Sequence, residues 1–153
     1  MALIPFVRMF PAQGTAETRV VTVRGHAHLP DDDYALTEAY CPDPACNCRR
    51  VMISVAGRGQ QERGFLAAIG FGFDRDGEWS EPFLDPINPQ SEHAAALLEL
   101  VTYALADPVY VKRLEKHYRQ VKRAGKDGSG PKGAGAANRK RKRRERRRSG
   151  RAA

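Results

Sequence analysis

Apolar and polar residues alternate along several segments in the first part of the chain, and this pattern predicts a small antiparallel sheet. Residues 17–24 alternate and are rich in valine and threonine, as is typical of a half-buried strand. Residues 34–40 are expected to pair with them as a hairpin, after a polar loop over residues 25–33. Further strands are predicted at 50–56, 65–73 and 78–84, and residues 3–10 are expected to form an edge strand or an arm fixed to the body.

Helical spacing replaces this alternation in the second part of the chain. Leucine and valine recur at helical intervals over residues 97–105. Asn88 is expected to cap this helix with Pro89 in its first turn, and Pro108 requires the helix to end before it. Asp107 is then expected to cap a second helix. Its predicted buried face carries Tyr110, Val111, Leu114, Tyr118 and Val121. The predicted fold class is α+β, with a small, mostly antiparallel sheet packed by two C-terminal helices.

Charge divides the 153 residues into two parts. Residues 119–153 carry 15 of the 26 lysines and arginines and only two acidic residues, so their net charge is +13 against −5 for the rest. Residues 125–138 have the glycine-rich composition of a flexible linker, and residues 139–151 contain no apolar residue that would join a core. We therefore predict a folded domain over residues 1–124 and a disordered basic tail over residues 125–153.

The cysteines indicate a metal site. All three lie within eight residues, spaced C-x4-C-x-C, at Cys41, Cys46 and Cys48. Thiolates are strong zinc ligands, and Pro42-Asp43-Pro44 supplies a bend that lets the three reach one ion. Arg49 and Arg50 follow at once and are expected to offset the thiolate charge. The sequence thus predicts a zinc site that staples the domain, and the alternative is three ordinary cysteines or a reversible disulfide.

Structural zinc takes four ligands, and the sequence leaves the fourth open. His117 is the first candidate, because it lies three residues after Leu114 on the apolar face of the second helix. His93 lies in the first turn of the preceding helix. A strand over residues 34–40 would place the loop with the other two histidines about 20 Å from the cysteines. The remaining candidates are His26, His28, Asp43, Glu38, a water molecule or a residue of a second chain.

The cysteine block and the last helix together resemble a family of uncharacterised prokaryotic zinc-binding domains that share a C-x4-C-x-C cluster after a strand. The residues that carry the resemblance are Glu38, Tyr40, Cys41, Asp43, Pro44, Cys46, Cys48, Arg49, Arg50, Val51, Leu114, His117, Tyr118, Val121 and Lys122. The resemblance covers roughly residues 18–122 and omits the tail. It implies a metal-binding domain of unassigned function, and it adds some support to His117 as the fourth ligand.

The basic tail predicts a polyanionic partner. Its densest run is Arg139, Lys140, Arg141, Lys142, Arg143, Arg144, Arg146, Arg147 and Arg148. Such a segment would bind nucleic acid (DNA, RNA or the ribosome) through phosphates, without sequence preference, because it has no aromatic residue on which a base would stack. The alternatives are a solubilising tail, a localisation sequence, an anionic membrane surface or an acidic protein partner.

Three functions remain open at this stage, and a non-enzymatic role is favoured because Ser54 and Ser80 have no base near them in sequence. The first is a zinc-stapled domain whose arm binds nucleic acid. The second is a protein-interaction adaptor with structural zinc, and the third is a small zinc hydrolase with water as the fourth ligand. No leader pattern or apolar run of membrane-span length is seen, and the cysteine count is odd, so a cytoplasmic protein is expected.

Overall fold

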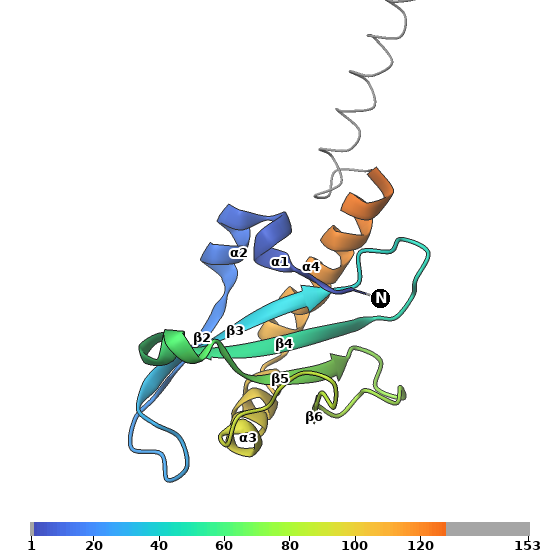
Figure 1. Ribbon diagram of the computed structural model, residues 1–153. Coiled ribbons are helices and arrows are strands. Elements are labelled where there is room, and N and C mark those ends of the chain that lie inside the picture. Colours follow the sequence, from blue (N-terminus) through green and yellow to red (C-terminus); the bar gives the residue numbers. More distant parts are fainter. Residues whose placement is uncertain (1, 128–153) are drawn as a thin grey trace, which may run out of the picture.

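The fold is built on one antiparallel sheet, seen in a computed structural model that describes residues 2–127 (Figure 1). The strand order is β1-β3-β4-β5-β6, and β2 pairs with the same strand, β3, as β1 does. The strands are β1 (Ile4–Pro5), β2 (Arg19–Val23), β3 (Asp32–Tyr40), β4 (Arg50–Gly57), β5 (Phe65–Gly72) and β6 (Phe83–Leu84). The predicted α+β class is confirmed, and so is the hairpin of β2 and β3. The basic run expected from residue 139 onward lies outside the described residues.

The N-terminal segment differs from the predicted edge strand. Only Ile4–Pro5 forms a strand, and two short helices follow, α1 (Phe6–Met9) and α2 (Pro11–Glu17). Pro11 occupies the first turn of α2, where a proline leaves no helical hydrogen bond unmade. Pro5 ends β1 and directly precedes α1, and Pro11 begins α2, so the predicted continuous strand is replaced by a two-residue strand and two short helices. The arm is nonetheless fixed to the body, because the Phe6 side chain is buried.

The long helices α3 (Ala94–Leu105) and α4 (Pro108–Asp127) lie across one face of the sheet (Figure 1). The predicted start of α3 is wrong, because Asn88 donates hydrogen bonds to the Asp85 carboxylate from its backbone N and its Nδ2. These bonds hold it in a loop, and α3 begins only after His93. The predicted start of α4 is confirmed, since the Val109 N–H donates to Asp107 Oδ1 at 3.0 Å.

The core lies between the sheet and these two helices. Successive residues of β3 and β4 alternate between buried and half-buried, so one face of each strand enters the core. The face of α4 that meets them is buried at Tyr110, Leu114, His117, Tyr118, Val121 and Ala124. Val111, predicted on this face, is only half-buried. The helix also continues through residues 125–127, which by composition were expected in the linker.

The predicted return strand at the end of the sheet is shorter than expected. The return strand expected over residues 78–84 is a strand only at Phe83–Leu84, after a turn in which the Gly77 N–H donates to the Asp74 carbonyl.

Among residues 2–127, no single helix is long and apolar enough to cross a bilayer, although α3 and α4 taken together, bent by 93°, meet that criterion.

Candidate metal centre

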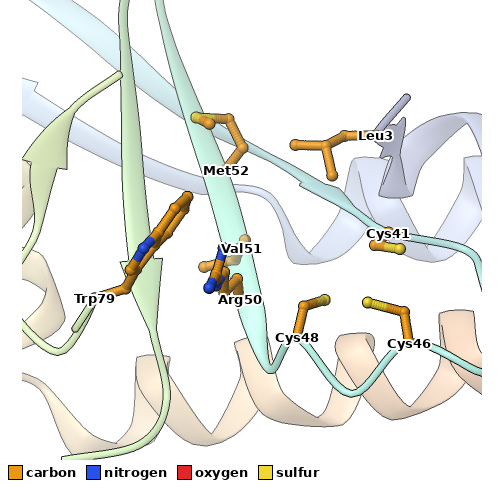
Figure 2. Close-up of a pocket in the computed structure, with 8 residues that line it drawn as sticks. All are labelled: Leu3, Cys41, Cys46, Cys48, Arg50, Val51, Met52 and Trp79. Carbon is orange, nitrogen blue, oxygen red and sulfur yellow. The ribbon is translucent and has the colours of Figure 1, made fainter. Parts of the chain in front are cut away.

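The loop between β3 and β4 brings the three cysteines together. The Sγ atoms of Cys41, Cys46 and Cys48 all lie within 4.8 Å of one another. Cys41 is buried, while the other two are partly exposed. The sulfurs of Cys46 and Cys48 point toward each other in Figure 2. The spacing that predicted a shared site therefore corresponds to a compact group of sulfurs at the end of the sheet.

The loop closes on itself through local hydrogen bonds. The Cys46 N–H donates to the Asp43 carbonyl at 3.1 Å, and the Ala45 N–H donates to the Asp43 carboxylate at 2.9 Å. Asp43 is thus the residue around which the predicted bend turns. The loop ends at Arg49, whose φ of 47° lies in the left-handed region that few non-glycine residues adopt. The Arg49 N–H is held there by the Tyr118 hydroxyl at 3.1 Å.

The C-terminal half of α4 packs against the cysteine loop. Besides the Tyr118 hydroxyl, Lys122 donates from Nζ to the Asp43 carbonyl at 2.7 Å. One turn later, a Cβ placed on Gly125 would lie 2.4 Å from the Pro42 carbonyl oxygen. Only a glycine allows the helix and the loop to approach this closely. These contacts position the cysteines relative to the rest of the domain.

The pKa values of Cys46 and Cys48 are shifted in opposite directions. Hydrogen bonds from the Cys48 and Cys41 thiols, together with the charge of Lys122, lower the pKa of Cys46 below its usual value. Burial raises the pKa of Cys48, and its hydrogen bond to the Cys46 sulfur acts in the same direction. Cys46 is therefore the thiol of this pair that ionises first. An ionised sulfur is the form that binds a metal ion.

Lys122 is the charged side chain that acts on the pKa values of Cys46 and Cys48, a role that the sequence predicted for Arg49 and Arg50. Arg49 Nε pairs with Asp74 at 2.8 Å, and its Nη2 lies 3.7 Å from Glu115. Arg50 lies over the Trp79 ring, with its Cζ 3.8 Å from the ring centroid. Lys122 follows Tyr118 by one helical turn, so helical spacing alone places the two side chains on the same face of α4.

The donor set fits zinc. Zn–S bonds of about 2.3 Å place the sulfurs of a tetrahedral site about 3.8 Å apart. The sulfurs here are within 4.8 Å, so a contraction of at most about 1 Å would bring them to that spacing. Three thiolates select zinc over magnesium or calcium, which prefer oxygen ligands. The structure therefore supports a metal site of three cysteines.

His117, the first candidate for the fourth ligand, is not brought together with the cysteines. Its Nδ1 lies 2.5 Å from Glu38 Oε1, and its Nε2 pairs with the Glu17 carboxylate. The ring also stacks on Phe6, with centroids 3.9 Å apart. Both nitrogens are therefore engaged, and Glu38 is engaged with them. The helical spacing correctly placed His117 on the buried face, but the two carboxylates come from distant parts of the chain.

The other candidates are also placed elsewhere. His93 Nε2 lies 3.3 Å from Glu92, and His26 accepts a hydrogen bond from the His28 N–H in the loop before β3. The Asp43 carboxylate is used within the loop, as described above. Within residues 2–127, the group of nearby ligand atoms contains the three cysteines alone. Water and a second chain remain as sources of a fourth ligand.

The sulfurs open on a cavity of about 230 Å³ that the sequence did not predict (Figure 2). Its other walls are mainly apolar and come from Leu3, Met52 and Trp79, with Arg50 beside them. Leu3, β4 and the turn that carries Trp79 are far apart in sequence, so no local pattern joins them. The alternation along β4 places Arg50 and Met52 on the same face of the strand. This is the part of the cavity wall that the sequence pattern could have predicted.

Comparison with known proteins does not extend this picture: no family model, curated protein or solved structure matches the chain. The resemblance to a prokaryotic zinc-binding family is therefore not confirmed. What the structure supports is the cysteine cluster that the resemblance implied.

Proposed function

We propose that the protein is a small, non-enzymatic zinc-binding domain in which the thiolates of Cys41, Cys46 and Cys48 hold one zinc ion. The observation that carries this proposal is the group of three sulfurs within 4.8 Å, in which hydrogen bonds from Cys48 and Cys41, helped by the charge of Lys122, lower the pKa of Cys46. The ion would join the end of β3 to the start of β4, which α4 also holds. Such an ion stabilises the fold directly, because its binding free energy is available only to the folded chain.

Zinc content of the reduced protein tests the proposal. We expect one zinc per chain in the wild type and none in Cys48→Ser. His117→Gln is the matched control, because His117 is engaged by two carboxylates away from the sulfurs. It should keep its zinc, provided that circular dichroism shows it to be folded. A reduced wild type without zinc would contradict the proposal, and loss of zinc from folded His117→Gln would restore His117 as a ligand.

A zinc hydrolase is the second candidate for this centre, and the cavity beside the sulfurs favours it. Catalytic zinc keeps a position for water or substrate, whereas structural zinc is closed by four protein ligands. Cobalt substitution distinguishes the two, because cobalt reports its ligands in its visible spectrum. A spectrum that changes when azide is added would indicate an exchangeable ligand. A spectrum that azide leaves unchanged would indicate a closed, structural site.

For the basic tail we propose non-specific binding to nucleic acid. The supporting observation is the charge of the chain: residues 119–153 carry +13, of which +10 lies in the tail, against −5 for the rest, so attraction to phosphates comes mainly from the tail. Binding of a fluorescent 20-base-pair duplex should weaken steeply as salt rises, and should be lost on truncation after Asp127, which keeps α4 whole. Salt-independent binding, or binding retained by the truncated protein, would contradict it. Capture of a protein partner by the truncated body would favour the adaptor function instead.

A further inference from the structure

The cavity beside the cysteines has the composition of a ligand site. Sulfurs form one wall, and Leu3, Met52 and the Trp79 indole form the apolar remainder (Figure 2). Its volume of about 230 Å³ is below the roughly 300–1,000 Å³ of sites for drug-sized ligands. A ligand that fits here is therefore small, and its main body is apolar.

Arg50 is the polar group of this cavity. Its guanidinium lies over the Trp79 ring, 3.8 Å from the centroid, and it forms no ion pair with any carboxylate in the described part of the chain. Trp79 is itself fixed, because its ring meets Phe83 edge to face at 4.6 Å and its carbonyl accepts the Gly72 N–H at 2.7 Å. A guanidinium held in this way presents unused N–H donors in a fixed plane, which suits the two oxygens of a carboxylate.

Charge at the centre also favours an anion. Three thiolates around a divalent cation leave one negative charge, which Lys122 offsets from the α4 side. Arg50 then adds a positive charge on the cavity side. A ligand with one negative charge would leave the centre neutral, whereas a cationic ligand would meet Arg50 unfavourably.

We propose that this cavity binds a small carboxylic acid with an apolar body. Its carboxylate would pair with the Arg50 guanidinium and, where the proposed zinc is bound, would face the ion, while its apolar part would pack on Leu3, Met52 and Trp79. The metal contribution rests on the proposed zinc site, while the Arg50 contribution does not. The same chemistry is offered by a free short-chain acid and by the C-terminus of a peptide that ends in an apolar residue.

Trp79 makes this testable, because it is the one tryptophan of the chain. Its fluorescence is followed while hexanoate is added to the zinc-loaded protein, with hexanol as the uncharged comparison. Acetyl-Gly-Leu, with a free or an amidated C-terminus, represents the peptide end. We expect saturable binding of hexanoate, at least tenfold tighter than hexanol. The tighter of hexanoate and free acetyl-Gly-Leu identifies the source of the ligand.

Arg50→Gln should weaken the binding of hexanoate at least tenfold. Arg58→Gln is the matched control, because Arg58 is an exposed arginine of η1 (Arg58–Arg63), and its affinity should equal that of the wild type. The proposal is overturned if the zinc-loaded wild type shows no saturable change with either acid, or if Arg50→Gln binds as the wild type does. Titration of the metal-free protein separates this from a failure of the zinc site, since Arg50-dependent binding would persist there with lower affinity.

Discussion

At the scale of single residues, His117 joins the N-terminal arm to the body. From α4 its ring contacts Glu38 of β3, Glu17 at the end of α2 and Phe6 of α1. The imidazole is fully buried and Glu38 nearly so. A protonated His117 between two carboxylates forms a partly buried ion-pair network. Removing one member of such a network leaves another charge without a partner.

The pH dependence of this network follows from two pKa shifts of opposite sign. Burial lowers the pKa of His117, but its bonds to Glu38 and Glu17 outweigh burial and raise the pKa above 6.5. The bond to His117 lowers the pKa of Glu17 below 4.5, with Gln13 and the charge of Lys116 acting in the same direction. The stabilisation is therefore lost as pH rises through the raised pKa of His117, and as pH falls through the lowered pKa of Glu17.

His117→Gln tests this dependence. We expect it to lower the free energy of unfolding by roughly 3 kcal/mol near pH 5.5, where His117 is protonated and Glu17 is ionised, and by less at pH 9. Urea denaturation of both proteins across this range measures the difference. Both proteins contain the same three cysteines, so the contribution of the cysteines to this difference cancels. His28→Gln, at an exposed histidine, should show no such trend. A constant difference from pH 5.5 to pH 9 would mean that His117 acts by packing alone.

The Tyr110 hydroxyl is buried and has no hydrogen-bond partner within residues 2–127. An unpartnered buried hydroxyl costs about 1–3 kcal/mol. Tyr110→Phe should therefore raise the free energy of unfolding by about 1 kcal/mol. Tyr40→Phe is the matched control and should lower it, since the Tyr40 hydroxyl donates to Glu38 at 3.0 Å. A destabilised Tyr110→Phe would show that the hydroxyl is satisfied, for example by water.

At the scale of elements, the contact of α4 with the cysteine loop decides the geometry of the metal centre. Gly125→Ala would normally stabilise a helix by about 1 kcal/mol. Here the new Cβ would meet the Pro42 carbonyl at 2.4 Å, so the loop must move. We expect a loss of about 1 kcal/mol or more in stability, and at least tenfold weaker zinc binding in competition with a chromogenic chelator.

The matched control for this change is Thr102→Ala, at an exposed position of α3, which alters helix propensity without touching the loop. It should leave zinc affinity unchanged. Equal zinc affinity in Gly125→Ala and wild type would show that α4 does not position the cysteines.

Which elements could be predicted follows from where their stabilising contacts lie. β3 and β4 are half-buried, and their local alternation is enough to predict them. The start of α3 is different, because Gln90 is drawn to the backbone of Ala68, 22 residues away, by hydrogen bonds of 2.9 and 3.0 Å. A good cap and a proline at residues 88–89 cannot start a helix against these bonds. Local preference was overridden by tertiary contacts.

At the scale of the whole molecule, the same distinction separates the parts of the site. The cysteines are close in sequence, so their spacing predicted their cluster. A further ligand would have to come from a distant segment. The partners of His117 are also distant, because Glu38 and Glu17 lie 79 and 100 residues away in sequence. The cavity also depends on distant segments, since Leu3 meets β4 only through the pairing of β1 with the end of β3.

Zinc should therefore act on the stability of the entire domain, because the cysteine loop lies where β3, β4 and α4 meet. Cys46→Ser should lose the metal and several kcal/mol of the free energy of unfolding measured with zinc present. In a chelator, the wild type and the variant should unfold at nearly the same urea concentration, since the substitution itself is small and partly exposed. Equal stability of the two proteins with zinc present would mean that the ion is not structural. A large difference in chelator would instead assign the effect to packing of the thiol, so the pair of conditions separates the metal from the side chain.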